Sequence, residues 1–214
     1  MHALAQVAHF DVDDDVLSER FGGLTPGTDI PALARSLTSV CGPGIVVWRA
    51  LVVPGHFDAR HSAIARRYRY DLEIGQRADP LRRHAVWHLE REPDLAVLRL
   101  ATDPLIGEHD FAAFCRRPPD RPTGPITRRV TTAEWRREAD GILRFEIEAK
   151  AFCHQMVRSI VGALVAAGQG RLRPSDIAGF LRSGRRDGAP TLAPPQGLCL
   201  IAVRYPDDLG GSWV

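Results

Sequence analysis

Alternating hydrophobic and polar positions predict two half-buried β-strands in the middle part of the chain. In residues 66–74, aromatic and aliphatic side chains occupy every second position, with charged side chains between them. The same pattern recurs in residues 142–150. Successive side chains of a strand point to opposite sides, so each segment should turn one face to a core and the other to solvent or a ligand. The apolar face of the second segment consists of Leu143, Phe145, Ile147 and Ala149.

Helical spacing of apolar residues predicts four helices. They cover residues 30–40, 94–105, 156–167 and 176–181. The third helix is apolar almost all around and ends near Gly168, while Ser175 is the expected N-cap of the fourth.

Three further strands are predicted, at residues 6–10, 45–53 and 198–205. The second is β-branched and stops at Pro54-Gly55, and Pro206 ends the third. Asp11 to Asp15 should form an exposed acidic loop, and the loop at 116–127 should lie on the surface. Strands alternating with helices through short connections predict an α+β fold with a mostly antiparallel sheet.

Composition is that of a globular protein, with 44% hydrophobic and 25% charged residues among 214. No window approaches the roughly 18 uninterrupted apolar residues of a membrane span, and the N-terminus has no signal-peptide pattern. We therefore expect a cytoplasmic protein without a membrane partner.

The cysteines and histidines show no metal-binding or redox spacing. The four cysteines form no CxxC pair, so we expect free thiols, no disulfide framework and no zinc site. The eight histidines likewise lack a ligand pattern. The cysteines are Cys41, Cys115, Cys153 and Cys199.

Arginine clusters carry more information than the net charge of +2. They lie at residues 60–69, 116–129 and 182–186, and Lys150 is the only lysine. Codon bias in a GC-rich genome explains the preference for arginine but explains the clustering less well. Because arginine binds phosphate bidentately and stacks on bases, the clusters indicate a nucleic-acid partner.

Two residues are candidates for chemistry on physical grounds. Tyr68 shares a strand face with Tyr70 and is either an ordinary core residue or a functional one. Arg158 is the only charge in the apolar helix at 156–167. A buried guanidinium costs several kcal/mol, by order of magnitude, unless it is paired. The alternative for Arg158 is a position at the helix edge, from which it reaches solvent.

The segments Arg60–Tyr70 and Phe152–Gly162 together resemble two active-site segments of the tRNA pseudouridine synthase A family, which isomerises uridine in the tRNA anticodon stem-loop. The resemblance extends over nearly the whole chain and includes Gly107–Phe111 and Pro194–Leu198. It implies that the Tyr68 ring stacks on the target base, with its hydroxyl a candidate for proton transfer. It also implies that the family's arginine matching Arg158 pairs with a catalytic aspartate.

The resemblance implies further partners and an architecture. Arg60, Arg66 and Arg67 become candidates for tRNA-backbone contacts, with a solvated strand edge as the alternative. His154 could face the site, although a structural role is the more ordinary one. The family needs no cofactor or metal and acts as a homodimer on tRNA. Its fold has two ferredoxin-like α/β halves around a basic cleft, which implies an incomplete N-terminal half at 1–60, a C-terminal half at 61–206 and a tail at 207–214.

The beginning of the sequence resembles the segment that comes directly after the family's aspartate motif, G-R-T-D-A-G-V. His2–Phe10 matches the continuation of that motif and places Met1 on its valine. A GTG start codon encodes valine elsewhere, so we expect a gene start assigned too late and a chain without its nucleophilic aspartate. A true internal start would leave the same sequence. Asp11 to Asp15 lie after the strand and do not replace that residue. We expect these 214 residues to be inactive alone, and poorly soluble or only partly folded in residues 1–60.

Two other classes remain open from the sequence. A non-catalytic RNA-binding protein would bind tRNA with an affinity that falls steeply with salt. A protein-interaction module would keep Tyr68 and Arg158 buried and paired internally, and would be indifferent to tRNA.

Overall fold

A computed structural model describes residues 2–117, 123–185 and 192–207. The chain forms two compact units. The larger unit contains Met1–Gln6 and Ile64–Val203, and the smaller one contains Val7–Ala63 and Arg204–Trp213. Each unit is described by itself.

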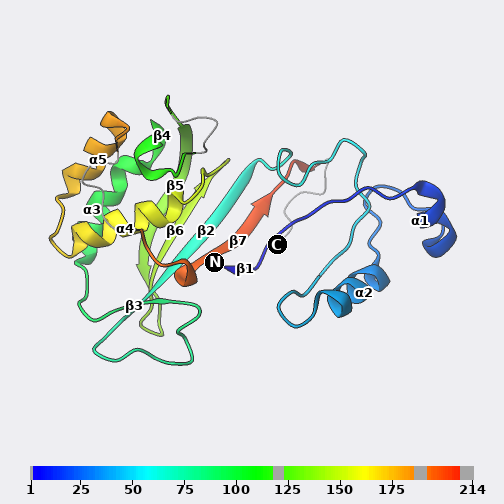
Figure 1. Cartoon of the computed structure of the whole chain (residues 1–214), viewed down its shortest axis with the longest axis horizontal. Helices are drawn as coiled ribbons and strands as arrows, with labels where there is room; N and C mark the ends of the chain where they lie inside the picture. The colour runs from blue at the N-terminus through cyan, green and yellow to red at the C-terminus, as the bar shows by residue number, and fades with distance from the viewer. Residues whose placement is uncertain (1, 118–122, 186–191, 208–214) are drawn as a thin grey trace. The chain divides into compact units, whose positions relative to one another are not determined.

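The larger unit is built on one open sheet of seven strands in its described part, ordered β1-β7-β2-β6-β5-β4, with β3 beside β2 (Figure 1). The path β2-β6-β5-β4 is antiparallel, whereas β1 pairs with β7 and β3 with β2 in parallel. The expected mixed α+β class is confirmed. The strands are β1 His2–Ala3, β2 Ala65–Ile74, β3 Trp87–Leu89, β4 Gly107–Asp110, β5 Thr127–Arg137, β6 Leu143–Ala149 and β7 Leu198–Arg204.

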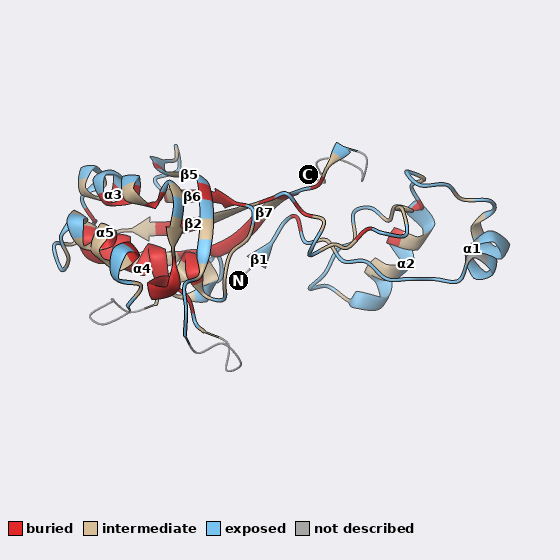
Figure 2. Cartoon of the chain, turned by 90° about the horizontal axis from the view of Figure 1, so that it is seen from above, coloured by how far each residue is buried: buried red, intermediate tan, exposed pale blue. Residues whose placement is uncertain are grey.

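Three α-helices pack together on one face of this sheet (Figure 1). The most buried is α4, whose apolar residues cover nearly its whole circumference (Figure 2). Its side chains pack against fully buried strand residues such as Tyr70, Leu72 and Phe145. The α-helices are α3 Leu95–Thr102, α4 Met156–Gly168 and α5 Pro174–Ser183, and the 3₁₀ turns are η1 Asp103–Leu105, η2 Ala112–Phe114 and η3 Pro195–Gly197.

The smaller unit contains α1 Asp14–Phe21 and α2 Pro31–Cys41. The prediction of a helix at 30–40 is confirmed, but α1 begins inside the run that was expected to form an acidic loop. Gly22 ends α1 with a φ of +80°, a backbone conformation that glycine adopts without steric cost.

The predicted strands at 6–10 and 45–53 are wrong. Residues 6–10 have no regular structure, and the N-terminal pairing involves His2–Ala3 instead. Residues 45–53 form only the isolated bridge between Asp29 and Leu51. β-Branched residues favour a strand when a neighbouring strand pairs along its length, whereas in the described part of the smaller unit only residues 27–30 bond to the backbone of residues 50–52.

In the larger unit the predicted N-cap of α5 is also wrong. The helix begins at Pro174 and its N-cap is Arg173, because proline at the first helical position already has the required φ. The Asp176 carboxylate accepts a hydrogen bond from the Arg173 backbone N–H at 2.9 Å. The sequence analysis also missed β5, whose alternation is interrupted by an irregularity between Val130 and Thr132.

The expectation of four free thiols is contradicted by a disulfide. Cys115 and Cys153 are 38 residues apart in sequence, yet their Cα atoms lie 5.7 Å from each other and their sulfurs are bonded. Sequence spacing could not predict the Cys115–Cys153 bond, because the end of η2 and the turn before α4 come together only in the folded unit. Cys41 and Cys199 are free. Residues 118–122 of the predicted surface loop lie outside the described residues, and Pro125 beyond them is exposed.

Candidate active site

Tyr68 lies on β2, on the side of the sheet that α4 covers. Its ring is half-buried and meets the Phe152 ring edge-on, with centroids 5.1 Å apart and planes at 87°. Burial raises the pKa of the Tyr68 hydroxyl, and the positive charge of Arg66 partly opposes that shift. Tyr68 is therefore a neutral phenol at physiological pH, with an aromatic face that remains partly accessible.

Arg158 emerges from the first turn of α4 and is half-buried. Its Nε donates to the carbonyl oxygen of Ala193 at 2.6 Å, and the Ala193 N–H donates back to the Arg158 carbonyl at 3.2 Å. Among the described residues, no carboxylate pairs with its guanidinium. The sequence alternatives were pairing or escape to solvent, whereas the structure holds one edge of this guanidinium on a backbone carbonyl.

Tyr70 lies two residues beyond Tyr68 on the same face and is fully buried. Its hydroxyl donates to the carbonyl oxygen of Pro194 at 2.6 Å. Burial raises the pKa of Tyr70 well above its ordinary value, against an opposing effect of the Arg158 charge. The hydroxyl therefore stays protonated and remains a hydrogen-bond donor.

The turn into α4 carries the remaining members of this region. Gln155 is the only described non-glycine residue with positive φ, at 66°, and it turns the chain from His154 into the helix. Such a conformation costs about 1 kcal/mol or more and persists where the surroundings enforce it. His154 is exposed, and its carbonyl accepts a hydrogen bond from the Arg116 N–H at 2.9 Å. This bond and the disulfide together tie the segment after η2 to the turn before α4.

The predicted phosphate-binding arginines are divided between two faces and two units. Arg66 shares the Tyr68 face, and its Nη1 donates to the Lys150 carbonyl at 2.7 Å. Arg67 lies on the opposite face, where its Nη2 is 3.0 Å from a Glu148 oxygen. Arg60 is exposed in the smaller unit, where its backbone N–H donates to the Asp58 carboxylate at 2.7 Å.

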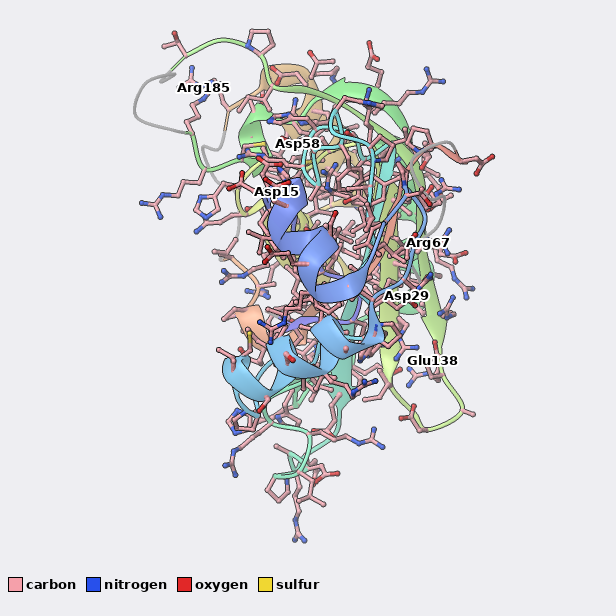
Figure 3. The ribbon with its side chains drawn as sticks, turned by 90° about the vertical axis from the view of Figure 1, so that its right-hand side faces the viewer. Asp15, Asp29, Asp58, Arg67, Glu138 and Arg185 are labelled. Carbon is pink, nitrogen blue, oxygen red and sulfur yellow. A yellow bond between two sulfur atoms is a disulfide. The ribbon has the colours of Figure 1, made fainter. Side chains whose placement is uncertain are left out.

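The face of the sheet that carries Arg67 is an ion-paired surface. Opposite charges stand across from each other in the β2–β6 register, with Arg67 facing Glu148 and Asp71 facing Arg144. Arg144 donates to both Asp71 oxygens, at 2.7 and 3.1 Å. Figure 3 shows Arg67 and Glu138, which belong to opposite ends of this network. Asp71, Glu146 and Glu148 on this face are buried and paired with arginine, while the Arg67 and Arg136 side chains remain partly exposed to solvent.

Sequence reasoning missed three participants in the site. Phe152 packs against Tyr68, while Ala193 and Pro194 provide the carbonyls that hold Arg158 and Tyr70. Side-chain patterns say nothing about backbone acceptors, so only the resemblance of Pro194–Leu198 to a family segment pointed to this region.

Within the described residues, no group of three or more His, Cys, Asp and Glu side chains is arranged to hold a metal ion. In the same part of the chain, no helix has the length and apolar character needed to cross a membrane.

Comparison with known proteins identifies the class first. A family model described as tRNA pseudouridine synthase matches residues 101–206, which include β5, β6, α4 and β7. This match places the region that carries Arg158 among the pseudouridine synthases.

The curated relatives narrow the class. A tRNA pseudouridine synthase A from Frankia casuarinae is 42% identical over 209 residues, which cover 97% of this chain and 71% of the relative. Proteins of the same name from Leifsonia xyli and Geotalea daltonii are 38% and 35% identical, and the alignments cover 73% and 78% of their lengths. The chain belongs to the tRNA pseudouridine synthase A family.

Proposed function

We propose that this protein is a tRNA pseudouridine synthase that isomerises uridine in the anticodon stem-loop. The observation that carries the proposal is Arg158, a half-buried arginine fixed on one edge and not paired with any described carboxylate. The names of the relatives support the same reaction, and so does the resemblance of the segments that carry Tyr68 and Arg158 to two active-site segments of the family. In that reaction an aspartate attacks the target uridine, the glycosidic bond breaks and the base rotates. C5 then joins the sugar as the aspartate is released, and the C5 proton is lost to solvent.

Each site residue has a proposed role. Tyr68 stacks on the target base, which must leave the helical stack at a cost of a few kcal/mol. Arg158 holds the aspartate ionised, because an opposite charge at close range favours the charged form. Arg66 is placed on the Tyr68 face to contact phosphate, while Arg60, Arg67 and His154 are proposed as more peripheral tRNA contacts.

The described residues bring no carboxylate to Arg158, so the nucleophile is not among the site residues named above. We propose that these 214 residues bind tRNA but do not turn it over, and that the nucleophilic aspartate is supplied by a segment outside them. The proposal also includes a cytoplasmic homodimer. Each chain would have an incomplete N-terminal ferredoxin-like half at residues 1–60, a C-terminal half at 61–206 and a tail at 207–214. No cofactor is proposed.

The test compares this chain with the same chain extended by the in-frame upstream codons. tRNA labelled with tritium at uridine C5 releases the label when pseudouridine forms. We expect tRNA binding without release from the 214 residues, and release from the extended protein. Within the extended protein, Tyr68→Phe and Arg158→Lys should reduce the rate of release.

The outcomes separate two failures. Release by the 214 residues alone would refute the proposed need for the upstream aspartate. If neither protein binds tRNA at any salt concentration, the proposed function itself is refuted. Binding by both without release, and no upstream aspartate motif, would favour a non-catalytic RNA-binding protein.

A further inference from the structure

The segment Ala193–Gly197, here named the strap, accepts hydrogen bonds from the side chains of Arg158 and Tyr70. The Arg158 Nε donates to the carbonyl oxygen of Ala193, and the Tyr70 hydroxyl donates to the carbonyl oxygen of Pro194, each at 2.6 Å. These two acceptors are adjacent in sequence. The arginine and the tyrosine therefore hold the same short piece of backbone from different elements, α4 and β2.

The strap also packs directly on Tyr70. A Cβ atom added to Gly197 would lie 2.6 Å from Tyr70 Cε1 and 2.9 Å from the Asp71 carbonyl oxygen. Because heavy atoms do not approach this closely, only glycine fits between the strap and β2 at this position. The Tyr70 ring is thus in contact with one end of the strap while its hydroxyl holds the other.

This arrangement limits which part of Arg158 can reach a ligand. A guanidinium has five N–H donors in a rigid plane, and the Ala193 carbonyl takes the one on Nε. The donors on Nη1 and Nη2 have no partner among the described residues. Fixing the Nε edge fixes the plane of the group, so the terminal nitrogens present a defined fork to an incoming carboxylate.

We propose that Tyr70 is a positioning residue for Arg158, acting through the strap. Its hydroxyl holds the Pro194 carbonyl, which keeps the neighbouring Ala193 carbonyl where it receives Nε and orients the guanidinium. This inference rests on the proposed function for the identity of the carboxylate that Arg158 receives. The orientation of Arg158 itself is measurable without tRNA.

The experiment measures solvent exchange of the Arg158 Nε–H proton by NMR in the ¹⁵N-labelled chain. The resonance is assigned by its disappearance in Arg158→Lys. Tyr70→Phe removes only the hydroxyl and should raise the exchange rate about three- to tenfold, as loss of one net hydrogen bond does. Gly197→Ala keeps the hydroxyl but displaces the strap, and should raise the rate in the same range.

Thr102→Val is the matched control. It also removes a buried hydroxyl, which accepts from Trp135 Nε1 at 3.1 Å and donates to the Leu98 carbonyl at 2.8 Å. We expect it to leave Arg158 Nε–H exchange unchanged. If Arg158 Nε–H exchange were accelerated equally in Thr102→Val and Tyr70→Phe, the cause would be general destabilisation and the proposal would be overturned. Unchanged exchange in Tyr70→Phe would overturn it as well, whatever Gly197→Ala shows.

These results are independent of the reaction. Failure of the extended protein to release tritium would refute the proposed function and leave the Arg158 exchange rates as measured. If the extended protein releases tritium but Arg158 Nε–H exchange is unchanged in Tyr70→Phe, only the positioning role of Tyr70 is refuted.

Discussion

The two units of this protein use similar hydrophobic residues to different effect. In the larger unit, fully buried aromatic and aliphatic side chains join the sheet to α3, α4 and α5 in one core. In the smaller unit the buried apolar side chains are few, and exposed surface dominates (Figure 2). Seven of the twelve large exposed hydrophobic residues of the described chain lie between Val7 and Ala63: Phe10, Val12, Val16, Val40, Ile45, Val46 and Trp48.

The comparison shows that apolar composition does not by itself produce a core. Residues 66–74 and 45–53 were both predicted as strands, but β2 has neighbours on both sides and residues 45–53 make one isolated bridge. β2 is paired along its length with β6, and its apolar side chains share one core with α4. The segment 45–53 makes only a few backbone bonds, mainly to residues 27–30, and Ile45 and Val46 remain exposed.

The largest difference should appear in backbone hydrogen exchange. Amides of β2, β6 and α4 should exchange only through global opening, whereas amides of residues 7–63 should open locally. At a typical domain stability of about 5 kcal/mol or more, this separates their protection factors by at least about a thousandfold. Mass spectrometry of peptic fragments gives the comparison. Uniform strong protection with a single sharp melt would contradict it and the expected partial folding of residues 1–60.

Core truncation should distinguish the units next. Phe145 is fully buried, with its ring centroid 4.9 Å from that of Trp135, so Phe145→Ala should lower the free energy of unfolding by about 3–5 kcal/mol. Trp48 is 61% exposed, and Trp48→Ala should change it by less than about 0.5 kcal/mol. Urea denaturation followed by circular dichroism measures both. Comparable losses in the two variants would mean that Trp48 is covered in solution.

The disulfide should account for a smaller part of the stability of the larger unit. A bond between Cys115 and Cys153 closes a loop across 38 residues, and its removal should cost about 2–4 kcal/mol. Cys115→Ser combined with Cys153→Ser should show that loss under non-reducing conditions, and Cys41→Ser should not. Thiol titration of the denatured, unreduced chain should find Cys41 and Cys199 reactive. Four reactive thiols would show that the bond does not form in the purified protein.

The same comparison explains what the sequence could predict. The strands at 66–74, 142–150 and 198–205 and the helix at 156–167 were predicted because their side-chain period matches the environment that the sheet and α4 provide. The segment 45–53 has an equally suitable pattern. A pattern records what a segment favours, while pairing depends on residues far away in sequence.

The site divides in the same way. Arg158 could be selected because one charge in an apolar helix is visible in the sequence, and Tyr68 because the resemblance supplied its match. The carbonyls of Ala193 and Pro194 carry no side-chain signal at all. The bond between Cys115 and Cys153 was missed because tertiary structure, not spacing, brings the two residues together.

The smallest expected effect concerns one turn of the smaller unit and tests how far its local structure persists. The Asp58 carboxylate (Figure 3) accepts the backbone N–H groups of Arg60 and His61, each at 2.7 Å, and the bond from His61 is the main cause of its lowered pKa. Since the folded pKa lies below 3.8, the ionised carboxylate stabilises the turn above that pH, and the contribution is lost as pH falls through the folded pKa. The amide chemical shift of His61, followed by NMR, should titrate with a midpoint below pH 3.8 in the parent chain, and this transition should be absent in Asp58→Asn. The amide of Phe145 is the control and should show no transition from Asp58. A midpoint at 3.8 or above would mean that the turn is absent in solution, and the contrast between the units would then extend to the local hydrogen bonds of the smaller one.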